Sequence, residues 1–183
     1  MNIIEFIGAK GGVGTSTVAM HCAAAYAKDG STVDVWDPSG DVRAMSVSNA
    51  YFATRSEGLF SLFADVIVSD GPIPEHWKSR LLHPSSGDVR FVRVLVTDNS
   101  YLSLRRATAH TEECMVVVMD SSRPLNAKDV NEVLGPRHVV ATISCDDRAK
   151  VQADAGILPS TAGANFNLAL LNSCAVELHT VAT

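Results

Sequence analysis

A glycine-rich segment between an apolar run and an alanine-rich run most constrains the fold. Residues 2–7 are short, apolar and rich in β-branched side chains, which predicts a buried strand. Residues 16–28 are rich in alanine and end before Asp29 and Gly30, which is typical of a helix with a glycine C-cap. Between them lies Gly8-Ala-Lys-Gly-Gly-Val-Gly14-Thr15-Ser16, whose glycines let backbone N–H groups turn inward around phosphate oxygens. A glycine-rich turn without a ligand is the alternative, and the strand–loop–helix context disfavours it.

The rest of the chain alternates between strand-like and helix-like segments. Apolar runs of strand length occupy residues 32–36, 66–69, 89–96, 114–119 and 139–143. Helical candidates occupy residues 58–64, 101–110, 127–134, 148–155 and 165–178. Because parallel strands need crossovers that are usually helical, this alternation predicts a parallel sheet covered on both faces. A chain of 183 residues without internal repeats is expected to form one α/β domain over residues 1–183.

Composition narrows the functional classes. With a net charge of −5, the protein has no overall positive field that would attract nucleic acid or anionic lipid. A local basic patch formed by Arg137, Arg148 and Lys150 stays an open alternative. No apolar run approaches the roughly 18 residues of a membrane span. The N-terminus lacks the features of a signal peptide, and the four cysteines are scattered, so a cytoplasmic protein without a zinc site or disulfide frame is expected. Residues 165–183 contain no Lys or Arg, so no membrane-surface helix is expected there.

The glycine loop departs from a standard P-loop in one informative way. Thr15 stands where the standard motif has lysine, and the loop's lysine, Lys10, stands at its head. The segment KGGVG with this leading lysine resembles the deviant Walker A motif of the ParA/MinD superfamily of P-loop ATPases. Its longer form KGGVGTST also resembles TadZ/CpaE-type relatives. The resemblance implies a single-domain, three-layer P-loop NTPase fold with a mostly parallel twisted sheet flanked by helices, and ATP with Mg²⁺ as cofactors.

The resemblance also implies roles for individual residues. The nucleotide would be bound by the loop residues Gly8, Lys10, Gly11, Gly12, Val13, Gly14, Thr15, Ser16 and Thr17. Lys10 would reach the nucleotide of a second subunit, and Ser16 places a hydroxyl where Mg²⁺ is bound.

Two aspartates extend this implied site. Asp37, in a segment similar to the family's DxDPQGN, would orient the attacking water and assist the metal; a simple β-turn is the alternative for this segment. Asp70 ends a segment similar to the Walker B strand and would hold the metal's hydration shell. Cys145 and Asp146, in a segment similar to VVAxIPxD, would lie beside the base.

Two functional hypotheses follow from the resemblance. The first is an ATP-dependent dimerising switch of the ParA type that positions or segregates cargo such as plasmid or phage DNA, with slow hydrolysis. The second is a localisation or assembly scaffold of TadZ/CpaE type that hydrolyses ATP weakly or not at all; a subunit with an empty pocket is a third. Lys10, Asp37 and Asp70 favour the first hypothesis, and Thr15 favours the second. The implied partners are ATP or ADP, a second copy of the chain and an adaptor or stimulating protein, with no membrane; DNA stays open, although the net charge does not favour it.

Overall fold

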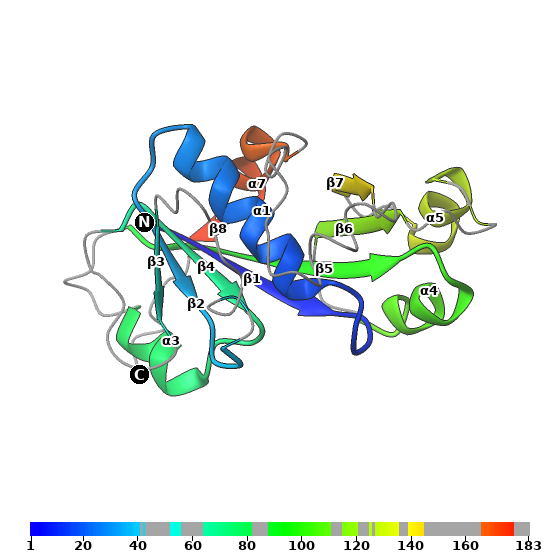
Figure 1. The fold of residues 1–183 in the computed structure, drawn as a ribbon, viewed down its shortest axis with the longest axis horizontal. Helices are drawn as coiled ribbons and strands as arrows, with labels where there is room; N and C mark the ends of the chain where they lie inside the picture. The colour runs from blue at the N-terminus through cyan, green and yellow to red at the C-terminus, as the bar shows by residue number, and fades with distance from the viewer. Residues whose placement is uncertain are drawn as a thin grey trace.

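Parallel strands dominate the sheet of this protein (Figure 1). The computed structural model describes residues 1–40, 42, 52–55, 64–81, 88–110, 115–120, 125, 127–135, 139–144 and 166–177. Within these residues one eight-stranded sheet has the order β3-β2-β4-β1-β5-β6-β7, and β8 pairs antiparallel with β5. The strands are β1 Asn2–Gly8, β2 Val33–Trp36, β3 Phe52–Arg55, β4 Val66–Asp70, β5 Arg90–Asp98, β6 Met115–Asp120, β7 Val139–Ser144 and β8 Val176–Glu177. The helices are α1 Thr15–Lys28, α3 Glu75–Leu81, α4 Tyr101–Ala107, α5 Ala127–Leu134 and α7 Leu168–Cys174.

The sheet and its covering helices confirm the predicted α/β fold class with a mostly parallel sheet. Six predicted strands and the helices predicted at 16–28, 101–110 and 127–134 have counterparts with closely similar bounds. The helix predicted at 165–178 is too long: α7 ends at Cys174, Ala175 is extended, and the next two residues pair with β5. Pairing with a strand distant in sequence here overrides the local helical pattern. The helix predicted at 148–155 lies outside the described residues, and so does the helix predicted at 58–64 except for Ala64.

Successive side chains of each strand point to opposite faces of the sheet, and different helices cover the two faces. On one face, valines of β4, β5 and β6 pack with Phe6 of β1 against α1, with α7 beside it (Figure 1). On the other face, Leu95 and neighbouring residues pack under α4 and α5, whereas Ile67 and its neighbours pack near α3. Every residue of β2 and β4 is buried, as expected for parallel strands covered on both sides.

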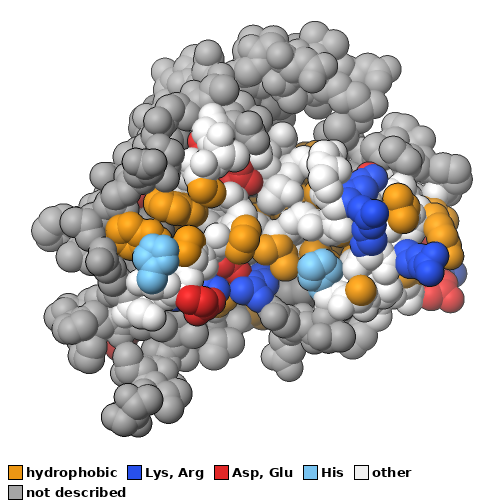
Figure 2. All heavy atoms as spheres, turned by 90° about the horizontal axis from the view of Figure 1, so that it is seen from below, with side chains coloured by type: hydrophobic (Ala, Val, Ile, Leu, Met, Phe, Trp, Pro, Cys, Tyr) orange, Lys and Arg blue, Asp and Glu red, His pale blue; other side chains and the backbone are white. Residues whose placement is uncertain are grey.

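A buried carboxylate anchors the face opposite α1. Glu5 of β1 is fully buried; its Oε1 accepts from the backbone N–H of Ile73 at 2.7 Å, and its Oε2 accepts from Arg93 Nε. Lys78 Nζ on α3 lies 3.7 Å from Oε1. In Figure 2, which looks onto the side of the molecule away from α1, acidic and basic side chains lie together near the middle. Because a buried charge is costly unless paired, this cluster ties the segment before α3 to the centre of the sheet.

The strand order determines where a ligand can bind. β1 lies between β4 and β5, and the parallel strands bring the loops after β1, β2, β4 and β5 to the same edge of the sheet. In open parallel α/β sheets this carboxyl edge is where ligands bind. No helix in the described part of the chain combines the length and apolarity needed to cross a membrane.

Candidate functional site

The glycine loop at the end of β1 has the backbone geometry of a phosphate cradle. Gly12 and Gly14 adopt left-handed conformations, with φ of 71° and 93°, which side chains with a Cβ rarely adopt. A Cβ at Gly11 or Gly12 would meet nothing within 4 Å, so that side of the loop is open. α1 then begins at Thr15, confirming the predicted strand–loop–helix order.

The N-terminus of α1 is prepared for an anion. Gly14 occupies the N-cap position, no side chain caps the helix, and its first turn contains no acidic residue. The first N–H groups of a helix have no partner within it and carry the positive end of its dipole. Together with the open loop, these groups fit a phosphate group, so the residues present agree with the implied nucleotide.

Two contacts pack the loop tightly on its closed side. A Cβ at Gly8 would lie 2.6 Å from Thr15 Oγ1, so the Thr15 side chain lies directly against Gly8. A Cβ at Gly14 would lie 3.2 Å from Met119 Cε at the end of β6. Glycine is therefore favoured at Gly8 by the close approach of Thr15 and at Gly14 by its left-handed backbone conformation.

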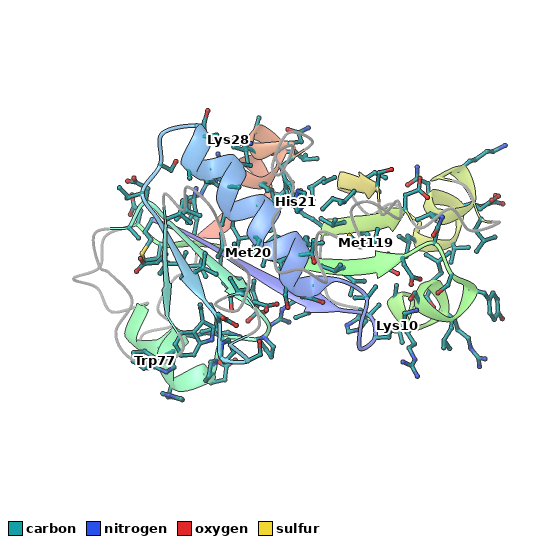
Figure 3. The ribbon with its side chains drawn as sticks, viewed as in Figure 1. Lys10, Met20, His21, Lys28, Trp77 and Met119 are labelled. Carbon is teal, nitrogen blue, oxygen red and sulfur yellow. The ribbon has the colours of Figure 1, made fainter. Side chains whose placement is uncertain are left out.

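Lys10 is held within its own subunit. Its Nζ forms a 2.9 Å ion pair with Asp98 Oδ2 and lies 3.4 Å from Ser100 Oγ. Figure 3 shows Lys10 on the loop after β1, on the side where α4 lies. Both side chains are largely buried, with 19% of Lys10 and 11% of Asp98 exposed.

The two carboxylate oxygens of Asp98 have different partners. Oδ1 accepts from the backbone N–H of Ser100 at 2.9 Å and from its hydroxyl, an arrangement that begins α4, while Oδ2 pairs with Lys10. Burial raises the pKa of Asp98, but hydrogen bonds from Ser100 and Lys10 outweigh it and hold that pKa well below its ordinary value. Asp98 is therefore ionised at neutral pH.

The two predicted metal-side aspartates both lie at the carboxyl edge. Asp37 follows β2 and is buried, and its Oδ1 accepts from Ser39 Oγ at 3.1 Å and from the N–H of Gly40 at 2.9 Å. The β-turn alternative is thus present, because the carboxylate closes a turn. Asp70 ends β4, next to β1 in the sheet, and is 8% exposed.

The glycine loop, Asp37 and Asp70 follow or end neighbouring strands, so they lie at the same edge of the sheet. Cys145 and Asp146 lie outside the described residues. The roles of all these residues stay predictions. Among the described side chains, no group of three or more His, Cys, Asp or Glu could hold a metal ion by itself. Sequence reasoning missed Asp98 and Ser100, for which Asp-x-Ser before a helix was the available signal.

Comparison with known proteins agrees with this geometry. Residues 2–71 match the family model described as ATPase MipZ, a stretch that contains β1, the glycine loop, β2 and β4. No curated protein sequence matches the chain.

Solved structures share the fold at low sequence identity. A ParA family ATPase from Chlorobium tepidum TLS has a TM-score of 0.55 at 17% identity, covering 84% of this chain and 88% of that one. MinD from Pyrococcus horikoshii OT3 in complex with Mg-ADP has a TM-score of 0.60 at 16% identity, covering 90% and 92%. The MinC:MinD complex from Aquifex aeolicus has a TM-score of 0.64 at 14% identity, covering 97% and 98%.

The fold and the glycine loop together define a P-loop NTPase fold with a loop sequence of the deviant Walker type. With the match of residues 2–71 to the ATPase MipZ model, the chain is similar to ATPases of the ParA/MinD type in its N-terminal sequence and in its fold.

Proposed function

We propose that the protein is an ATP-dependent dimerising switch that positions or segregates cargo such as plasmid or phage DNA. The observation that carries the proposal is the open glycine loop before the uncapped N-terminus of α1, with Lys10 at its head. The match of residues 2–71 to the ATPase MipZ model and the fold shared with a ParA family ATPase support a positioning or partition ATPase in general. The cargo is the finer part of the proposal, and the net charge of −5 argues that any DNA contact depends on a local patch or an adaptor protein.

Each residue contributes a distinct part of the proposed cycle. Backbone N–H groups of the loop and of α1 bind the phosphates, and the Ser16 hydroxyl and Asp70 hold Mg²⁺ and its water shell. When bound, Mg²⁺ supplies the positive charge that offsets the phosphates. Asp37 orients the attacking water. Lys10 contacts the nucleotide of the second subunit, so that the dimer depends on ATP.

Thr15 supports the competing scaffold function. Without a lysine at this position, the loop lacks a cation that would stabilise charge developing on the phosphates, so turnover is expected to be slow. A protein that binds nucleotide and assembles with partners without hydrolysis would keep the same loop geometry.

Solution mass separates the two functions. We expect analytical ultracentrifugation to show a monomer without nucleotide and with ADP·Mg²⁺, and a dimer with ATP·Mg²⁺. Lys10→Ala should abolish the dimer and leave the monomer folded, whereas the control Lys128→Ala, an exposed lysine on α5, should behave like the wild type. A mass that is the same in all three conditions would favour the scaffold.

A further inference from the structure

The sheet register brings the segments that carry Lys10 and Asp98 side by side. In the parallel pair β1–β5, Gly8 is the partner of Val96, and the N–H of Ala9 donates to the Val96 carbonyl at 2.8 Å. β1 ends at Gly8, so Lys10 lies two residues further on in the glycine loop, whereas Asp98 ends β5 two residues after Val96. The register therefore brings the start of the loop that carries Lys10 next to the strand end that carries Asp98.

The orientation of the Asp98 carboxylate is fixed by contacts other than the one with Lys10. Its Oδ1 is tied to Ser100, and Ser100 is the N-cap residue of α4, whose side chain accepts from the N–H of Ser103. The carboxylate that faces Lys10 is thus oriented by the start of a helix. An ion pair with one pre-oriented and largely buried partner loses less side-chain entropy than an exposed pair between two flexible side chains.

We propose that Asp98 is a positioning residue that holds Lys10 on its own subunit, so that dimerisation must first break the Lys10–Asp98 ion pair. This inference rests on the proposed function, because it assumes that Lys10 acts on a second subunit. Lys10 cannot keep its 2.9 Å contact with Asp98 and extend to another chain at the same time. The ion pair therefore opposes assembly until bound nucleotide provides a better partner for the ammonium group.

The test uses Asp98→Asn, which changes the contact with Lys10 and keeps the contact with Ser100. The asparagine oxygen still accepts from Ser100 and begins α4, while an amide nitrogen, a donor, replaces the oxygen that faces Lys10. Glu132→Gln on the exposed side of α5 is the matched control, because it changes the net charge equally.

The first readout is the acetylation rate of Lys10 in the nucleotide-free protein, followed by mass spectrometry and normalised to the rate of the same lysine in the urea-unfolded protein. Asp98→Asn should raise this rate several-fold, and Glu132→Gln should leave it unchanged. In the wild type, added salt should also raise this normalised rate, because screening weakens the ion pair. This last measurement needs no variant and so does not depend on the folding of one.

The second readout is the dimer dissociation constant with ATP·Mg²⁺. If releasing one lysine is worth roughly 5-fold, as for a typical ion pair near a protein surface, the symmetric dimer should tighten by roughly 25-fold in Asp98→Asn. A wild-type dimer that Asp98→Asn leaves unchanged or weakens would overturn this inference alone. A wild type that forms no dimer with ATP would overturn the proposed function as well.

Discussion

Replacing Thr15 by lysine tests whether phosphate binds next to the first turn of α1. The Thr15 side chain lies against Gly8, and the preceding Gly14 provides no capping group. A lysine here would place its ammonium group near the helix N-terminus. Without ligand, this cation opposes the helix dipole and should destabilise the fold by about 0.3–1 kcal/mol. With ATP·Mg²⁺ bound, attraction to a phosphate at about 4 Å is worth at most about 4 kcal/mol at an effective dielectric of 20, before solvation reduces it.

After solvation we expect Thr15→Lys to bind ATP·Mg²⁺ about tenfold more tightly, which corresponds to about 1.4 kcal/mol. Calorimetric titration measures this, and thermal unfolding without nucleotide measures the opposite effect on stability. Thr15→Met is the control, because it adds similar length without charge. Equal affinities of the lysine and methionine variants would refute a phosphate beside position 15.

Three further predictions concern stability, and urea denaturation measures each. Burial lowers the pKa of His21 from 6.5 to about 4, and the nearby positive charge of Lys28 contributes to this shift. Below pH 6.5 the unfolded chain therefore binds a proton at His21 that the folded protein does not bind. Stability should therefore fall by up to about 1.4 kcal/mol per pH unit between pH 6.5 and 4, and this slope should be shallower in His21→Gln. Glu5→Ala removes the buried carboxylate from its arginine partner and should cost about 3 kcal/mol, whereas the exposed Glu75→Ala should cost far less; similar losses would contradict the account of the buried pair. Gly8→Ala should cost about 1–3 kcal/mol through its clash with Thr15, and Thr15→Ala in the same chain should recover part of that loss; no recovery would refute the contact.

Local patterns made the glycine loop predictable from the sequence. The strand, the loop and the helix are consecutive, so the residues that form the phosphate cradle are also neighbours in the chain. Valine-rich runs likewise marked the strands of a sheet buried on both faces. Asp37 was identified only through its resemblance to a known segment, since a β-turn would show the same residues.

Long-range pairing explains what the sequence did not reveal. The contact between Lys10 and Asp98 spans 88 residues and can be recognised only when the β1–β5 register is known. β8 is two residues long and exists because it pairs with β5. α3 follows Pro74 and was not among the predicted helices, although proline is well tolerated at the start of a helix.

The central place of β1 has a consequence for folding during synthesis. β1 is translated before both of its neighbours in the sheet, which begin only at Val66 and Arg90. Its apolar residues therefore have no strand partner until β4 has been translated, and the second partner, β5, follows later still. The first parallel pair available is β2 with β3, at one edge of the sheet. Backbone amides of β1 should thus gain protection from hydrogen exchange late, together with those of β5, and the phosphate loop can take its final shape only at that stage.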